Sequence, residues 1–272
     1  MKKLLGIVVL GLLMSGNVFA SIIVCTNSRD GQDTIVIAID KKQKFINLNN
    51  ETIKLDLPDE YGIKITFVEI FLDDTYRLSW IKKISKKNNI NIKSILDIGG
   101  NCGLTSILLR SQFTRSDIHC YEPNPEILKY LKNNAHICNF NFYNQAVGNS
   151  NKMVKLKVRK NDSILSSISG GETGKINQIS FEKAFERFKT DILDIVKMDC
   201  EGSEWEILEN IEIWKKVRFL TMEYHLGERD INHDRILDAL EKIGFSLVTK
   251  VDNDKKINYG MVLAYNRSLV SL

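Results

Sequence analysis

Residues that could do chemistry are concentrated in two short stretches, and the first is a glycine-rich loop. It runs from Ile95 to Gly103, where an apolar segment ends in an acidic residue and a cluster of glycines. Glycine permits unusual backbone dihedrals and lets a ligand approach the main chain closely. The helical pattern that starts at Leu104 adds N–H donors and a partial positive charge. This stretch therefore predicts a nucleotide-like ligand at the carboxyl end of a buried strand.

The spacing within this loop separates two classes of cofactor. A dinucleotide-binding loop requires G-x-G-x-x-G, whereas here Gly99 and Gly103 have three residues between them and follow Asp97. A carboxylate at that position would repel a pyrophosphate but would attract a cationic ligand with an amino group. The loop therefore favours S-adenosylmethionine over NAD, and a strand–helix turn without any ligand is the alternative.

The second stretch runs from Asp191 to Glu204 and predicts a buried strand, a tight turn and a helix. Three acidic residues, Asp199, Glu201 and Glu204, crowd the carboxyl end of this strand. Carboxylates that repel one another need protons, a cation or another partner. This strand end is therefore a second candidate site.

The next predicted strand, Phe219 to His225, ends near the same edge of the sheet. Its Glu223 and His225 should join Asp199 and Glu201 there, because the carboxyl ends of neighbouring parallel strands lie together. Three roles are open for this group: a general base that deprotonates a hydroxyl, ligands of a hard divalent ion, or helix capping with a packed histidine. We assign Asp199, Glu201 and His225 as catalytic candidates, and we assign no metal.

A further acidic position lies at the end of another predicted strand, Asp117 to Glu122. Glu122 follows the glycine loop by roughly 20 residues, where an acidic residue can accept hydrogen bonds from a ribose diol. Asn124 and Pro125 then open a helix as its cap and first residue. The alternative role of Glu122 is that of a solvated carboxylate at a strand end.

From Lys93 onward, predicted strands and helices alternate, which is typical of a parallel sheet with crossover helices. A third strand at residues 139–147 should end beside the adenine of the ligand. Residues 153–173 predict a hairpin and a loop over the same edge, where loops usually select substrate. An antiparallel hairpin at residues 245–265 closes the chain. We therefore expect an α/β fold with a Rossmann-like class I methyltransferase sheet, parallel except for the C-terminal hairpin.

Residues 21–80 predict a small β-rich module that precedes the α/β domain of residues 81–272. Turn signals such as Asp30-Gly31 and Pro58-Asp59 separate its short strands. The expected strands are Ile22–Val24, Thr34–Ile39, Phe45–Leu48, Thr52–Leu57, Ile63–Phe71 and Tyr76–Trp80. No residue pattern in this module suggests chemistry, so we expect it to be structural or to help dock a substrate.

The first 20 residues have the pattern of a cleavable secretory signal peptide: a basic start, an apolar run from Leu4 to Met14, and Val18 and Ala20 before the cleavage point. The run is too short to span a bilayer comfortably, so we expect no stable membrane span. The five cysteines are odd in number and include no C-x-x-C pair. They are therefore interpreted as reduced thiols, which suit the cytosol. These two observations favour opposite compartments.

The composition limits the possible partners. A chain of 272 residues that is 43% hydrophobic and 26% charged is globular rather than disordered. Its net charge of +4 and the lack of a basic–aromatic stripe argue against nucleic acid as a partner. We therefore expect a small-molecule or glycan acceptor, and the oligomeric state is left open.

The two stretches resemble the signatures of the FkbM family of S-adenosylmethionine-dependent methyltransferases. The segment LDIGGNCG at residues 96–103 is similar to the family's D-x-G-A-N-x-G loop, and VKMDCEGSE at residues 196–204 is similar to its K-x-D-x-E-G-x-E signature. Gly100 stands where the family usually has alanine, and Cys102 where it has an aliphatic residue. The resemblance covers residues 95–265 and implies O-methylation of a hydroxyl on a sugar, polysaccharide or natural product.

The resemblance also implies roles for single residues. Asp97 would bind the amino acid part of the cofactor, the backbone of the glycine loop its carboxylate side, and Glu122 its ribose. The implied cofactor-binding set is Asp97, Gly99, Gly100, Asn101, Gly103, Glu122, Pro123, Asn124, Gln145 and Ala146. Asp199, Glu201 and His225 would lie near the acceptor hydroxyl.

Two rival functions follow from the same sequence. An NAD-dependent oxidoreductase is disfavoured by the spacing of the glycine loop. A secreted, non-catalytic β-module protein with an inactive methyltransferase-like domain would explain the signal-like start. An active methyltransferase implies a cytoplasmic location, and the signal pattern makes a periplasmic or secreted location the alternative.

Overall fold

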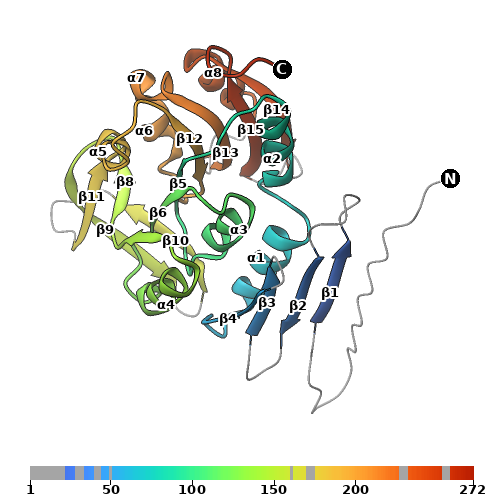
Figure 1. The fold of residues 1–272 in the computed structure, drawn as a ribbon. Helices are drawn as coiled ribbons and strands as arrows, with labels where there is room; N and C mark the ends of the chain where they lie inside the picture. Colours follow the sequence, from blue (N-terminus) through green and yellow to red (C-terminus); the bar gives the residue numbers. More distant parts are fainter. Residues whose placement is uncertain are drawn as a thin grey trace. The chain divides into compact units, whose positions relative to one another are not determined.

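A computed structural model describes residues 22–27, 34–39, 44–48, 51–159, 162–169, 175–226, 232–252 and 258–272. The chain divides into two compact units, Met1–Pro58 and Asp59–Leu272. The signal-like segment expected at residues 1–20 lies outside the described residues. Each unit is described by itself below (Figure 1).

The first unit contains a four-stranded antiparallel sheet in the order β1-β2-β3-β4. Its strands are β1 (Ile22–Asn27), β2 (Thr34–Ile39), β3 (Lys44–Leu48) and β4 (Glu51–Leu55). They coincide with the first four strands expected from the sequence. Successive antiparallel neighbours joined by short connections form a meander, which three or more strands can stabilise.

The last two strands expected in the N-terminal region are wrong. The first segment lies in α1 (Tyr61–Phe71), and the second is a turn that leads into α2 (Leu78–Lys87). Both helices belong to the second unit. The buried residues of α1 include Ile63, Phe67 and Ile70. Their spacing of four and three residues is the helical period, which the β-branched composition of this segment obscures.

The second unit is built on a seven-stranded sheet in the order β14-β15-β13-β12-β5-β6-β7. Its strands are β5 (Ser94–Ile98), β6 (Asp117–Tyr121), β7 (Asn141–Tyr143), β12 (Leu193–Met198), β13 (Val217–His225), β14 (Phe245–Asp252) and β15 (Tyr259–Asn266). Five of them, β5, β6, β7, β12 and β13, pair in parallel, and β15 is antiparallel to both β13 and β14. The expected fold class is confirmed.

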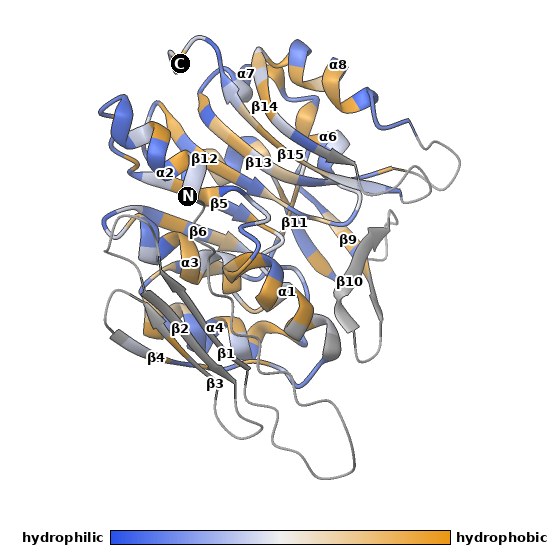
Figure 2. Ribbon diagram, turned by 90° about the vertical axis from the view of Figure 1, so that its right-hand side faces the viewer, coloured by the Kyte–Doolittle hydropathy of each residue, from blue (hydrophilic) through white to orange (hydrophobic). Residues whose placement is uncertain are grey.

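Helices connect and cover the strands of this sheet. They are α3 (Leu104–Gln112), α4 (Leu128–Cys138), α5 (Phe181–Glu186), α6 (Glu204–Leu208), α7 (Ile211–Trp214) and α8 (Arg235–Lys242). Every residue of β5 and β12 is buried, as expected for central parallel strands covered on both faces. Figure 2 shows these central strands largely in the hydrophobic colour. The core therefore fixes the strand ends at which the candidate residues lie.

The third expected strand, residues 139–147, is wrong as a single element. It divides into β7, in the large sheet, and β8 (Ala146–Gly148), in a smaller sheet of order β10-β9-β11-β8. The break falls at Asn144, whose side-chain amide donates to the carbonyl of Glu122 at 2.8 Å. The smaller sheet also contains β9 (Lys152–Arg159), β10 (Asp162–Ser169) and β11 (Ile176–Ser180). Its antiparallel β9–β10 pair is the hairpin expected in this region.

Within the part of the chain that the structure describes, none of the helices has the length and hydrophobicity needed to cross a membrane. The four cysteines whose side chains are described, Cys102, Cys120, Cys138 and Cys200, form no disulfide.

Candidate cofactor and acceptor site

A cavity of about 530 Å³ lies at the carboxyl ends of the parallel strands of the large sheet. Its size is within the range of ordinary ligand pockets. Of the sequence-predicted residues, the cavity is lined by Gly99, Gly100, Asn101, Glu122, Pro123, Gln145, Ala146, Asp199, Glu201 and His225. Asp97, Gly103 and Asn124 do not line it. One cavity therefore brings together the glycine loop, the Glu122 turn and the acidic cluster.

The backbone of the glycine loop is conformationally suited to close contacts. Gly99 and Gly103 have φ values of +74° and +89°, which are in the left-handed region that favours glycine. A Cβ atom on Gly99 would lie 1.6 Å from the carbonyl oxygen of Asp199, and one on Gly100 would lie 2.0 Å from the Cys120 sulfur. The loop therefore packs directly on the end of β12, with its backbone along the cavity.

Asp97 lies beneath this loop rather than in the cavity. Its side chain is fully buried, 3.2 Å from the Lys197 ammonium, and its second oxygen accepts a hydrogen bond of 2.6 Å from Ser106. Lys197 also donates to the carbonyl of Gly99 at 2.7 Å. Burial alone would lower the pKa of Lys197, but the neighbouring Asp97 and Asp199 carboxylates raise it. This buried ion pair fixes the loop from below.

Glu122 is buried at the edge of the cavity. Its two carboxylate oxygens accept hydrogen bonds from the backbone N–H groups of Asn101 (2.8 Å) and Asn124 (2.7 Å). Burial raises the pKa of Glu122 to about 7, although these two hydrogen bonds lower it. Each oxygen has a further lone pair that a ribose hydroxyl could use.

Asn124 has a local role that differs from the expected one. Its side-chain oxygen accepts a hydrogen bond of 3.0 Å from the backbone N–H of Glu126. This contact caps a turn, and α4 begins at Leu128, later than Pro125. The predicted helix cap is therefore wrong: the N-cap of α4 is Ile127, and the helix starts three residues later than expected.

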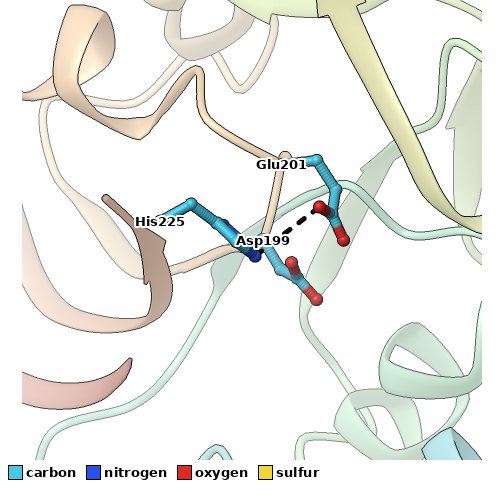
Figure 3. A group of neighbouring side chains, drawn as sticks. All are labelled: Asp199, Glu201 and His225. Atoms are coloured by element: carbon cyan, nitrogen blue, oxygen red, sulfur yellow. Dashed lines mark ion pairs between the residues drawn. The ribbon is translucent and has the colours of Figure 1, made fainter. Parts of the chain in front are cut away.

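The acidic cluster occupies another side of the same cavity. Asp199, Glu201 and His225 offer ligand atoms that all lie within 4.8 Å of one another. Figure 3 shows the three side chains converging from the ends of the two neighbouring strands. His225 Nε2 lies 3.6 Å from Glu201 and 3.3 Å from Glu223. The structure therefore brings together the residues that the sequence assigned to the acceptor, and a divalent ion could also bind there.

The charges of this cluster influence one another. Burial would lower the pKa of His225, but its hydrogen bonds to Glu204 and Glu223 raise it to about 11. Burial and the nearby Asp199 raise the pKa of Glu201 to about 8, against the effect of His225. In the protein without ligands, His225 is therefore cationic at neutral pH and is no general base.

Two residues outside the assigned catalytic set hold this cluster in place. Tyr76, in the turn before α2, donates its hydroxyl hydrogen bond to Asp199 at 2.8 Å. Glu204 is fully buried, contacts His225 Nδ1 at 3.0 Å, and accepts hydrogen bonds from the backbone N–H groups of Cys200 and Gly202. Glu204 is part of the signature-like block, but Tyr76 is 123 residues from Asp199. No local pattern could have found Tyr76.

Helix α1 forms a further wall of the cavity. Ile63, Thr66, Glu69 and Ile70 line it, which gives this wall apolar and acidic character. Burial and the charge of Asp199 raise the pKa of Glu69. This helix, which was predicted to be a strand, thus contributes directly to the site.

A family model described as the methyltransferase FkbM domain matches residues 97–247, more than half of the chain. The chain belongs to this family. The resemblance stated from the two signatures is thereby confirmed. The protein is an S-adenosylmethionine-dependent methyltransferase by family, and S-adenosylmethionine is the cofactor expected in its cavity.

Solved structures show a distant likeness to this FkbM methyltransferase. One is the magnesium protoporphyrin IX methyltransferase of Synechocystis PCC 6803 with bound S-adenosylmethionine, with 12% identity, a TM-score of 0.44, and coverage of 78% of this chain and 86% of that chain. Another is the fibrillarin of Aeropyrum pernix with natively bound S-adenosylmethionine, with 13% identity, a TM-score of 0.43, and coverage of 90% and 93%. A search of curated proteins finds no match.

The residues of the cavity fit this cofactor. The backbone of the glycine loop lines the cavity at Gly99, Gly100 and Asn101, and the lack of Cβ atoms at Gly99 and Gly100 lets the loop pack tightly against the strand ends. Glu122 has a buried carboxylate at the cavity, and Pro123, Gln145 and Ala146 line the cavity with it. The part of the cavity nearest these residues is therefore suited to the nucleoside, and the acidic cluster to the acceptor.

Proposed function

We propose that this FkbM methyltransferase transfers a methyl group from S-adenosylmethionine to a hydroxyl of a sugar, polysaccharide or natural product. The observation that carries this proposal is the shared cavity, which is lined both by the glycine loop with Glu122 and by Asp199, Glu201 and His225. A bound cofactor would supply an electrophilic methyl group on a sulfonium. The first group of residues would hold that cofactor, and the second would hold the acceptor hydroxyl.

The cofactor half of the proposal uses the loop and the Glu122 turn. Glu122 would accept hydrogen bonds from the ribose, and its backbone contacts to Asn101 and Asn124 already hold it in place. Asp97 would hold the loop rather than contact the cofactor, because its side chain is fully buried and does not line the cavity, whereas Lys197 does line it.

The acceptor half uses Asp199 as the base. Tyr76 donates to one of its oxygens, which orients the other. His225 and Glu201 would position the acceptor, since both line the cavity beside Asp199. Most of the rate would come from holding the hydroxyl in line with the methyl group in a site that excludes water.

Calorimetry and methyl transfer test the proposal on the full chain. We expect micromolar binding of S-adenosylmethionine and no binding of NAD. With radiolabelled cofactor and a panel of hydroxyl acceptors, Asp199→Asn should lower kcat by about 100-fold or more and leave cofactor affinity unchanged, since general-base loss costs about 10²–10⁴-fold. Asp191→Asn is the matched control, because Asp191 is exposed and lies just before the other end of the same strand.

Two results would count against the proposal. A folded chain that binds no S-adenosylmethionine would favour the non-catalytic rival. Full activity of Asp199→Asn would remove Asp199 from the chemistry.

A further inference from the structure

We propose that Asp199, Glu201 and His225 bind a divalent cation of the Mn²⁺ and Mg²⁺ class at the acceptor end of the cavity. The ion's catalytic use rests on the proposed function, whereas its binding can be tested by itself. The ion would have mainly oxygen ligands and one nitrogen ligand. Because the site lies at the acceptor end of the cavity, the ion would contact the hydroxyl that reacts.

The positions of the donor atoms fit one ion. The two carboxylate oxygens and the imidazole nitrogen lie within 4.8 Å of one another. Ligands at 2.0–2.6 Å from a common ion cannot be more than roughly 5 Å apart. Mg²⁺ and Mn²⁺ prefer carboxylate oxygens as ligands, whereas the sites that select Zn²⁺ or Cu⁺ are rich in thiolates. Carboxylate oxygens with a single imidazole therefore suit Mg²⁺ or Mn²⁺.

A buried carboxylate outside this group orients the histidine. Glu204 is fully buried and contacts His225 Nδ1 at 3.0 Å. This contact directs Nε2 into the cavity, toward Glu201 and Glu223. Histidines that bind metals usually donate their other ring N–H to a carboxylate in this way, which fixes the tautomer and the ring orientation. An ion at Nε2 would replace the proton that this nitrogen carries in the metal-free protein.

The aspartate is oriented from a different part of the chain. Tyr76 donates to Asp199 Oδ2 at 2.8 Å, so the other oxygen can reach the cavity. The carbonyl of Tyr76 in turn accepts a hydrogen bond of 2.8 Å from Thr221 on β13. Ligating carboxylates in metal sites are commonly held by such outer hydrogen bonds. Two of the three ligands, His225 and Asp199, are thus each held by a hydrogen bond to a residue outside this group of three.

The charge balance of the cluster also favours a cation. Glu201, Glu204 and Glu223 all form ion pairs with the one imidazole of His225. The nearby ammonium of Lys197 is paired with Asp97. Carboxylates in such numbers need protons, a cation or another partner, and a cation would add a further positive charge. A divalent ion would supply it and would lower the pKa of a bound acceptor hydroxyl.

Titration of the full chain with Mn²⁺, followed by electron paramagnetic resonance after treatment with a chelator, tests the site. We expect about one bound Mn²⁺ per chain. His225→Gln and Glu201→Gln should each weaken Mn²⁺ binding at least 10-fold, and Glu204→Gln should weaken it by a smaller factor. His136→Gln is the matched control, because His136 is exposed on α4 outside the cavity; it should bind Mn²⁺ like the natural chain.

Calorimetry with S-adenosylmethionine separates this inference from the proposed function. Cofactor binding that is unchanged in His225→Gln shows that the variant is folded, so a loss of Mn²⁺ there supports the site. Failure of the natural chain to bind Mn²⁺ while it binds S-adenosylmethionine would overturn the metal site and leave the methyltransferase proposal intact. Equal Mn²⁺ binding by His225→Gln, Glu201→Gln and the natural chain would also overturn it.

Discussion

Replacing Lys197 by methionine should destabilise the second unit strongly. Lys197 and Asp97 face each other on the paired strands β12 and β5, with 3.2 Å between Nζ and Oδ1 and side-chain exposures of 2% and 0%. Methionine has a similar length but no charge, so the Asp97 carboxylate would stay buried without its cation. Removing one partner of a buried pair costs about 3–5 kcal/mol. The free energy of unfolding of a typical domain is only about 5–15 kcal/mol.

Urea denaturation followed by tryptophan fluorescence measures this loss, because all three tryptophans (Trp80, Trp205 and Trp214) lie in the second unit. The double variant Asp97→Asn/Lys197→Met removes both charges and should be less destabilised than Lys197→Met. Lys183→Met is the control: it breaks an exposed pair with Glu186 and should lower the free energy of unfolding far less. The reasoning is refuted if Lys197→Met lowers the free energy of unfolding no more than this control does. It is also refuted if the loss in the double variant equals the sum of the losses in Asp97→Asn and Lys197→Met.

Three further predictions concern the cavity. Burial raises the pKa of Glu122 to about 7, so affinity for S-adenosylmethionine should fall as pH drops from 8 to 6, and calorimetry should find this dependence absent in Glu122→Gln. A Cβ atom on Gly99 would overlap the Asp199 carbonyl, so Gly99→Ala should cost about 2–4 kcal/mol in urea denaturation and abolish cofactor binding. The control Gly244→Ala also has a positive φ but open space around its Cβ, so it should cost only about 1 kcal/mol. Tyr76→Phe removes the donor to Asp199 and should lower kcat about 10-fold with unchanged cofactor affinity; unchanged kcat in the transfer assay would contradict this role.

The sign of the Glu122 effect follows from its raised pKa. Below pH 7 the carboxyl is mostly protonated and loses acceptor capacity for the ribose hydroxyls. In the protein without ligands, the folded state holds this proton more tightly than the unfolded state. The proton on Glu122 therefore stabilises the folded state below the pKa that Glu122 has in the unfolded chain, and this stabilisation is lost as pH rises toward 7.

The large sheet could be predicted from the sequence because its signals are local. Apolar runs of five or six residues followed by glycine or acidic residues indicate buried strands and their ends. The glycine loop and the stretch from Asp191 to Glu204 show this pattern, and β5 and β12 lie where it predicts them.

The prediction failed where composition and spacing disagreed. The segment at residues 63–71 is rich in β-branched and aromatic residues, which favour strands, yet its buried residues follow the helical period. The single strand expected at residues 139–147 is divided between two sheets because Asn144 bonds to a distant carbonyl. Neither outcome could be read from local propensity, since packing partners decide between the alternatives.

By itself, the sequence determined the family, the cofactor loop and the residue types at the strand ends, because a short motif carries its own backbone geometry and chemistry. Only the tertiary structure decided which side chains act together. It placed Lys197 against Asp97 beneath the loop, and it brought Tyr76 to Asp199 across 123 residues of sequence. It also buried Glu204 behind His225. Such contacts depend on the packing of elements that are distant in the chain, and no local pattern encodes them.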